Sequence, residues 1–173
     1  MNPVFDQWNK AEESSAIESL LHCCATRKWA AQLASARPFS SLEALIAASD
    51  QVWLAMTQHD WMEAFAAHPR IGEKKAASAS AQSTTWSSDE QRQTEEASQQ
   101  TLRWLDEKNR KYEETFGFTF IVCATSKSAE EMLAILERRL RQTQLQELLE
   151  AAEQQRQITN LRLRKWLVEM DPR

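Results

Sequence analysis

Histidine is scarce in this sequence, and one of the three, His68, sits where an apolar residue is expected. It follows Trp61, Ala64 and Phe65 by seven, four and three residues, which on a helix places the imidazole on their apolar face. An inward-facing imidazole is a candidate general acid or base. The same position also suits a core histidine that donates to a backbone carbonyl, so both interpretations stay open.

Glu90 departs from its helical pattern in a similar way. On a helix that advances about 100° per residue, it shares a face with Ala97, Thr101 and Leu105, so its carboxyl group points inward. The alternative is a capping box, in which Glu90 accepts the backbone N–H of Ser87, three residues earlier. An imidazole and a carboxyl group that both face the interior are the components of a general acid/base pair.

A third polar position lies in the last predicted helix. Arg162 is at the margin of an apolar stripe, which consists of Leu145, Leu148, Leu149, Ala152, Leu163, Trp166, Leu167 and Met170. Its guanidinium could bind a buried anion through two parallel hydrogen bonds, or it could extend along the helix to reach water. Periodicity alone favours the second arrangement.

Helices must position these side chains, because only two glycines occur in 173 residues. Hairpin turns and glycine-rich phosphate loops need several, so the composition favours an all-α fold, and the length suits a single domain over residues 1–173. Apolar periodicity and capping boxes predict the helices. They comprise two short helices within 11–36, one from Ser40 with Glu43 as its capping partner, one from His59 to Pro69, one from Ser87 to about Tyr112, one from Ser128 and the longest from Thr143.

Two segments lie outside the helical pattern. Residues 116–124 form a strongly apolar run with β-favouring residues and one glycine, and no second run exists to pair with it. We therefore predict a buried extended connection between helices. Residues 74–88 are rich in Ala, Ser, Gln and Thr, which is typical of a mobile surface loop, and Trp86 within it is a weak candidate for a lid.

Charge and cysteine usage exclude several classes of partner. The chain has 21 basic and 25 acidic residues, a net charge of −4, which disfavours nucleic acid and acidic membrane surfaces. Cys23 and Cys24 are adjacent and Cys123 is remote, so there is neither a disulfide framework nor a metal-ligand spacing. We expect no metal, no membrane span, no secretory signal and a cytoplasmic location.

Four sequence blocks resemble, in order, the 2-oxo-4-hydroxy-4-carboxy-5-ureidoimidazoline (OHCU) decarboxylases of uric acid degradation. The blocks are His68-Pro69-Arg70-Ile71-Gly72, Trp86-Ser87-x-x-Glu90-Gln91, Asn109-x-x-Tyr112-x-x-x-Phe116-Gly117-Phe118-x-Phe120 and Ile158-x-x-Leu161-Arg162-Leu163. Each block alone recurs by chance, whereas the ordered set, which spans most of the chain, is specific. The chain differs from many relatives at Arg70-Ile71-Gly72, where they carry an acidic residue and a Leu-Ala pair.

The resemblance implies an all-α, cofactor-free lyase that forms a homodimer and converts OHCU to (S)-allantoin. It makes His68 and Glu90 the catalytic residues. It assigns the substrate contacts to Pro69, Ser87, Gln91, Phe120, Ile121, Val122, Cys123, Ala124 and Arg162. The C5=N bond of this substrate can accept the electrons that remain when CO2 leaves, so the reaction needs no metal or organic cofactor. Main-chain groups of residues 120–124 would bind the ureido and ring amides, and Arg162 an oxygen.

Two other classes of function are compatible with the same residue pattern. A non-enzymatic helical interaction module needs only the amphipathic helices and the acidic surface, with His68 in the core and Glu90 as a cap. A different acid/base lyase, such as a hydratase, could use the same two residues on the same scaffold.

Overall fold

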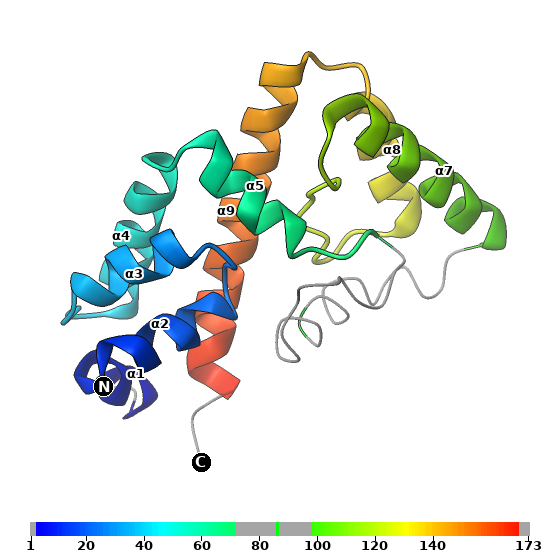
Figure 1. Cartoon of the computed structure of the whole chain (residues 1–173). Coiled ribbons are helices and arrows are strands. Elements are labelled where there is room, and N and C mark those ends of the chain that lie inside the picture. Colours follow the sequence, from blue (N-terminus) through cyan, green and yellow to red (C-terminus); the bar gives the residue numbers. More distant parts are fainter. Residues whose placement is uncertain (1–2, 72–85, 87–97, 170–173) are drawn as a thin grey trace. The chain divides into compact units, whose positions relative to one another are not determined.

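The computed structural model describes residues 3–71, 86 and 98–169 (Figure 1). Helices account for all the regular secondary structure in these ranges, which confirms the all-α prediction. The helices are α1 (Pro3–Lys10), α2 (Glu13–Leu21), α3 (Arg27–Ser35), α4 (Leu42–Leu54), α5 (Gln58–Ala66), α7 (Gln99–Phe116), α8 (Ala129–Arg139) and α9 (Gln144–Glu169). Among them, none is long and apolar enough to cross a lipid bilayer. Ser87, Glu90, Gln91 and residues 74–85 lie outside the described ranges.

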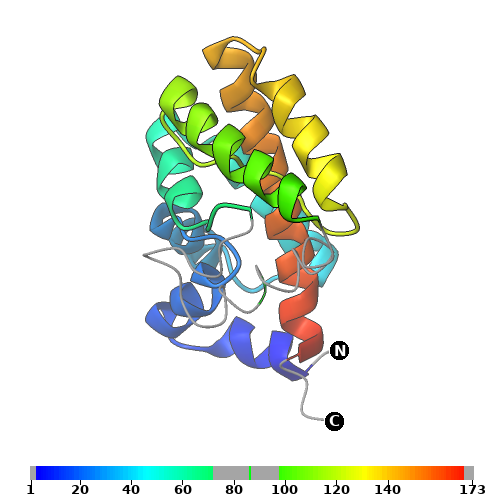
Figure 2. The ribbon, with the colours of Figure 1, turned by 90° about the vertical axis from the view of Figure 1, so that its right-hand side faces the viewer.

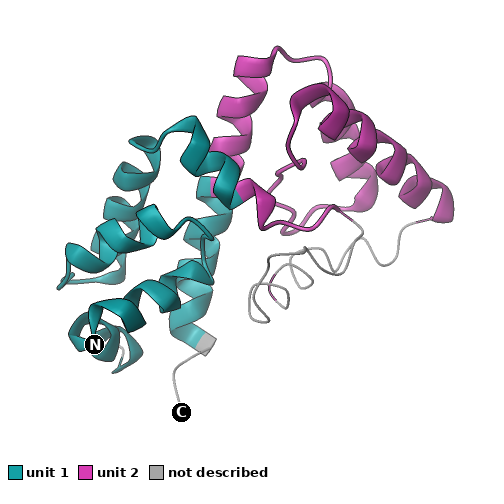
Figure 3. Cartoon of the chain, in the orientation of Figure 1, with its two compact units in different colours: residues 1–64, 156–173 teal, residues 65–155 magenta. Residues whose placement is uncertain are grey.

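The chain divides into two compact units (Figure 3). Unit 1 contains residues 1–64 and 156–173, and unit 2 contains residues 65–155. Helix α9 is continuous, and its residues up to Gln155 belong to unit 2 while the remainder belong to unit 1. That residues 1–173 act as one domain stays a prediction.

Aromatic side chains form much of the core of unit 1. Trp8 stacks on Phe39 and meets Trp166 edge-on, at centroid distances of 6.2 and 5.7 Å. Its indole N–H donates to the carbonyl of Ala16 at 3.1 Å, so the ring is buried with its polar atom satisfied. Trp8 lies on α1, a helix that the sequence patterns did not predict.

The start of α4 corrects one predicted cap. The hydroxyl of Ser41, and not that of Ser40, accepts the backbone N–H of Ala44 at 3.1 Å. Two adjacent serines offer the same capping chemistry, and a start at Leu42 places Leu45 inside the core. The choice between the two serines therefore depends on packing.

Local sequence predicted the starts of two later helices correctly. Ser128 and Glu131 form a reciprocal capping box at α8, with the Ser128 N–H donating to the carboxylate at 2.7 Å. Thr143 and Gln146 make the corresponding pair of hydrogen bonds at α9, of 3.0 and 3.3 Å. Each cap is complete within four residues of chain, so adjacent sequence is sufficient to specify it.

The predicted extended connection is present in unit 2 from Phe118 onwards, whereas Phe116, predicted as its first residue, belongs to α7. Helix α7 ends at Phe116, and the capping residue Gly117 has a φ of 80°, a left-handed conformation that glycine adopts without strain. Thr101 donates to Glu130 at 3.2 Å and Lys108 pairs with Glu137 at 3.5 Å, so α7 and α8 lie side by side in the same direction. Two neighbouring helices of the same direction need a connection that returns along their length. Residues 118–124 provide it in a non-helical, buried form (Figure 2).

The first half of α9 buries only part of the predicted apolar stripe, since Leu148 and Ala152 are buried as predicted. Leu145 and Leu149, both placed on the apolar stripe, are 65% and 52% exposed. Glu147 and Gln155 are instead fully buried. Their polar partners come from other elements of unit 2, which apolar periodicity does not reveal.

Candidate active site

His68 lies in a turn that follows α5. The helix ends at Ala66, and the His68 N–H donates to the Phe65 carbonyl at 3.1 Å. A residue that precedes proline disfavours the α conformation, so Pro69 ends the helix before His68. The prediction that His68 continues the helical stripe was therefore wrong in its local structure, and the imidazole is half-buried at a turn.

A hydrogen bond connects His68 to α9. Its Nε2 lies 2.7 Å from Oε1 of Gln155, a residue 87 positions later in the chain and 0% exposed. Sequence reasoning missed Gln155. The available signal was its place on the buried face of α9, three residues after Ala152 and three before Ile158, where an apolar residue is expected.

The adjacent residue of α9 holds the extended connection. The Gln154 amide oxygen accepts the backbone N–H of Cys123 at 2.9 Å. Two consecutive glutamines, Gln154 and Gln155, thus bring two predicted site elements to one turn of α9 within unit 2. These elements are the His68 imidazole and the 120–124 main chain.

Some main-chain groups of residues 120–124 are bound by other residues of unit 2. The carbonyl of Ile121 accepts from Nη1 of Arg139 at 2.5 Å, and the carbonyl of Cys123 accepts from Nζ of Lys127 at 2.6 Å. By contrast, within the described part of the chain the N–H and C=O of Val122 and the N–H of Ala124 make no hydrogen bond. Both residues are buried. Their polar groups can therefore bind a ligand's amides, as can the N–H and C=O of Phe120 and the N–H of Ile121, which also make no hydrogen bond among the described residues.

A buried ion pair supports this main chain. Arg139 and Glu147 both have fully buried side chains, and the guanidinium donates to the carboxylate through Nε at 2.8 Å and through Nη2. Tyr112 donates its hydroxyl to the same carboxylate, and burial raises the pKa of Tyr112 above its usual range. The Arg139 guanidinium also lies 4.7 Å from the centre of the Phe120 ring.

Arg139 is buried in spite of its local sequence. The acidic and basic run from Glu137 to Arg139 is typical of a solvated helix face, but Arg139 is 0% exposed. Desolvation of a guanidinium is tolerated where its donors are satisfied by a carboxylate and a carbonyl, as they are here by Glu147 and Ile121.

The segment after Pro69 is tied to α7. Arg70 donates through Nε and Nη2 to the two carboxylate oxygens of Glu113, at 2.8 and 2.5 Å. This two-point contact fixes the orientation of the guanidinium. Arg70 is one of the positions where the chain departs from many members of the family that it resembles, and here it anchors the chain next to Pro69 and His68.

Arg162 belongs to unit 1, where it is 3% exposed beside the adjacent cysteines. Burial raises the pKa of the Cys23 thiol well above its usual range and that of Cys24 to about 11, and the nearby Arg162 charge opposes both shifts in part. The preference for an arginine that extends to water was therefore wrong. All three cysteines are buried free thiols.

A family model for OHCU decarboxylases matches residues 9–164. The chain belongs to the OHCU decarboxylase family. The matched region contains every described helix from α2 to α8 and most of α9. The resemblance seen in four short blocks therefore extends over nearly the whole chain.

Two proteins are similar in sequence to most of the chain. The "Uric acid degradation bifunctional protein TTL" of Arabidopsis thaliana is 36% identical over 83% of this chain, which spans only 44% of that protein. A 2-oxo-4-hydroxy-4-carboxy-5-ureidoimidazoline decarboxylase of Haloferax volcanii is 24% identical over 92% of this chain and 94% of its own length.

Solved structures give the same fold. A crystal structure of OHCU decarboxylase in the presence of (S)-allantoin has a TM-score of 0.75 and 30% identity, covering 91% of this chain and 99% of that one. A structure of (S)-allantoin synthase, at 18% identity, has a TM-score of 0.71 and covers 94% of this chain and 53% of that one. The second likeness concerns the fold alone.

Only some residues of the four OHCU decarboxylase blocks lie within the described part of the chain. His68, Pro69 and residues 120–124 lie in unit 2, Arg162 lies in unit 1, and the catalytic candidate Glu90 lies outside the described residues with Ser87 and Gln91. Trp86 is only 1% exposed, so its prediction as part of a surface loop was wrong. The roles assigned to all these residues stay predictions.

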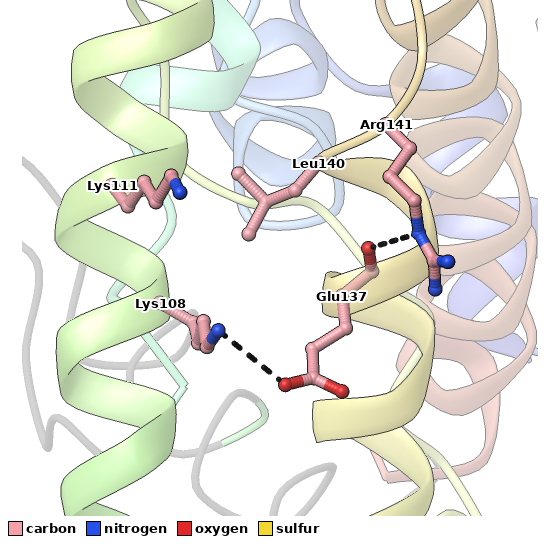
Figure 4. Close-up of a pocket in the computed structure, with 5 residues that line it drawn as sticks. All are labelled: Lys108, Lys111, Glu137, Leu140 and Arg141. Atoms are coloured by element: carbon pink, nitrogen blue, oxygen red, sulfur yellow. Dashed lines mark hydrogen bonds and ion pairs between the residues drawn. The ribbon is translucent and has the colours of Figure 1, made fainter.

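A surface pocket of about 290 Å³ lies between α7 and α8 (Figure 4). It is lined by Lys108, Lys111, Glu137, Leu140 and Arg141. None of these is a predicted site residue, and the Glu137 carboxylate is already paired with Lys108 at 3.5 Å. Among the described residues, no group of three or more His, Cys, Asp and Glu side chains is arranged to hold a metal ion.

Proposed function

We propose that the chain decarboxylates OHCU to (S)-allantoin in uric acid degradation. Family membership over residues 9–164 and the solved relative crystallised with (S)-allantoin support this activity. The observation that carries the proposal is the pair Gln154 and Gln155, which holds the Cys123 main chain and the His68 imidazole at one turn of α9.

The reaction needs orientation and two proton transfers. C4 of the substrate bears a hydroxyl and a carboxylate next to the C5=N bond. When the C4–carboxylate bond breaks and CO2 leaves, its electron pair forms a C4=C5 bond and the C5=N electrons move to nitrogen, which is protonated from solvent. The C4 hydroxyl then loses its proton and C5 gains one on a single face, which sets the S configuration.

Different residues carry out the proton transfers and the orientation of the substrate. His68 orients and deprotonates the C4 hydroxyl, and Glu90 supports the imidazole or delivers the second proton. The free main-chain groups of Val122 and Ala124 bind the ureido and ring amides of the substrate, as the family resemblance suggests for residues 120–124.

The remaining features of the proposal come from the family resemblance and the composition. Pro69, Ser87, Gln91 and Arg162 contribute substrate contacts. The enzyme acts without a metal or organic cofactor, as a homodimer, in the cytoplasm.

One assay tests the activity directly. The unstable substrate is generated in place from urate with the two upstream enzymes, and the optical activity of the allantoin is followed. We expect faster formation of a single enantiomer than in the absence of the chain. Racemic product at the spontaneous rate would contradict the proposal and favour an interaction module or a different lyase.

Two histidine variants, His59→Asn on α5 and His68→Asn just after it, form a matched pair. His59 is exposed on that helix and has no place in the proposed site, so His59→Asn is expected to retain stereospecific turnover. Loss of turnover in His68→Asn, with His59→Asn active, assigns the activity to this chain and excludes a contaminating enzyme.

A further inference from the structure

We propose that Gln155 is a positioning residue that keeps the hydrogen of the neutral His68 ring on Nε2, which makes Nδ1 the basic nitrogen. This inference rests on the proposed function of His68. It goes beyond the family resemblance, whose four blocks do not include Gln155.

The assignment follows from the donor and acceptor chemistry of the two groups. Oε1 of Gln155 is an amide oxygen, which only accepts hydrogen bonds, and it lies 2.7 Å from Nε2 of His68. With the Gln155 amide in this orientation, Nε2 carries the hydrogen. A neutral imidazole has one N–H and one lone pair, so the lone pair is on Nδ1.

Burial makes this arrangement costly to break. Gln155 is 0% exposed, so no solvent is available to replace the imidazole as a donor to Oε1. A buried amide oxygen that loses its donor is left with the full cost of its desolvation. The alternative tautomer, with the lone pair on Nε2, would face the lone pairs of Oε1 and carry this cost.

The backbones of Gln155 and His68 are both held in place by further contacts. Gln155 lies inside α9, and Gln154 next to it is bound to the Cys123 N–H. On the other side, the His68 N–H is bound to the Phe65 carbonyl, and the chain beyond Pro69 is anchored by Arg70 on Glu113. The bond between the two side chains therefore joins two positioned elements of unit 2.

The two ring nitrogens of His68 therefore have different roles in the reaction. Nδ1 accepts the proton of the substrate hydroxyl, while Nε2–H stays bonded to Gln155 before and after that transfer. The amide carries no charge, so it orients the ring without adding a negative charge beside it. This is the tautomer-fixing role that a partner of a catalytic histidine commonly has.

The direct test is the tautomer of His68 in solution. Protein labelled with ¹⁵N-histidine is studied by long-range ¹H–¹⁵N NMR at a pH where the ring is neutral, and His68 is assigned by its absence in His68→Asn. We expect a pyrrole-type Nε2 and a pyridine-type Nδ1. The opposite pattern, or an even mixture of tautomers, would overturn the inference.

Three variants separate hydrogen-bond acceptance from packing. Gln155→Leu removes the acceptor, and we expect the His68 signals to move towards a mixture of tautomers. Gln155→Glu keeps an acceptor oxygen, and we expect Nε2 to stay protonated. Gln154→Leu makes the same change one residue away and should leave the His68 tautomer unaltered. Equal spectra for Gln155→Leu and wild type would overturn the inference.

Kinetics of stereospecific allantoin formation give the second readout. We expect Gln155→Leu to lower kcat by about 10-fold or more, with KM close to wild type, because part of the general-base contribution is lost at unchanged binding. A wild-type kcat would overturn the role of Gln155 even with an altered tautomer. The NMR result does not require turnover, so an inactive wild-type chain with the Nε2–H tautomer would refute the proposed function alone.

Discussion

The imidazole of His68 is held from two sides, by the turn that ends α5 and by the amide of Gln155. Neither contact depends on the imidazole being charged, and the ring is only half-buried. A core histidine that merely fills space would contribute through packing. A catalytic histidine contributes through proton transfer, so the two interpretations make different predictions for substitution.

We expect His68→Ala to lower kcat/KM by about 10²- to 10⁴-fold, the usual contribution of a general acid or base, while cooperative unfolding is retained. The measurements are stereospecific allantoin formation and a thermal melt. An unfolded His68→Ala together with a fully active His68→Asn would show that the residue is structural.

At Arg162, we expect a lysine to be a poor substitute. The guanidinium is 3% exposed and offers a planar fork of donors, whereas an ammonium is a point charge on a flexible stem. Loss of a hydrogen bond to a charged group costs about 1.5 to 3 kcal/mol, so Arg162→Lys should reduce kcat/KM by about 10- to 100-fold. Kinetic constants equal to wild type would remove Arg162 from the site.

Helix α5 begins with a capping arrangement that also binds a lysine. The carboxylate of Asp60 accepts the N–H and hydroxyl of Thr57, both at 2.8 Å, and Nζ of Lys28 at 2.9 Å. The Lys28 hydrogen bond is the largest cause that lowers the pKa of Asp60 from 3.8 to about 2. An acid whose pKa is depressed on folding stabilises the protein above its unfolded pKa and loses that contribution as the pH falls.

We therefore expect Asp60→Asn to lower the free energy of unfolding by about 1 to 2 kcal/mol at neutral pH. The difference from wild type should be complete above the unfolded pKa of 3.8 and should disappear as the pH falls towards about 2. Urea unfolding across this range is the measurement. Asp106→Asn, at an exposed carboxylate paired with Arg110, is the control and should have little effect. A pH-independent difference would refute the linkage.

The elements around the extended connection are joined by the Arg139–Glu147 pair. Arg139→Met leaves a buried carboxylate without its cation, which typically costs about 3 to 5 kcal/mol. The double variant Arg139→Met/Glu147→Leu removes both charges, so we expect it to regain much of this stability. Because the Ile121 carbonyl still lacks its donor, we expect the double variant to retain a raised KM.

Urea unfolding and steady-state kinetics separate the two effects. Arg138→Met is the matched control, since the neighbouring Arg138 pairs with Glu150 at a half-exposed position and should contribute less than about 1 kcal/mol. A stable double variant with wild-type KM would show that Arg139 has no part in positioning residues 120–124.

For the whole molecule, we expect a strong chelator to leave turnover unchanged. The described residues contain no group of His, Cys, Asp and Glu side chains suited to a metal, and the proposed reaction uses the substrate's own C5=N bond as electron acceptor. Allantoin formation is measured after incubation with chelator and desalting. Activity that is lost and then restored by Zn²⁺ or Mn²⁺ would contradict this.

The sequence alone determined the features that depend on neighbouring residues. Scarce glycine predicted an all-α chain, and the pairs Ser128 with Glu131 and Thr143 with Gln146 predicted two helix starts. The apolar run at 116–124 predicted an extended connection, and four ordered blocks predicted the family. The caps and the extended run are local signals, because each is complete within a few residues.

Only the tertiary structure decided which polar residues are buried, and against what. Gln155 meets His68 across 87 residues of chain, and Arg139 meets the Ile121 carbonyl and Glu147 from a run that is typical of a solvated surface. The exposed Leu145 follows from the same packing. The cost of burying a polar group depends on the partners that helix packing brings together. Periodicity within one helix therefore cannot predict which polar residues are buried.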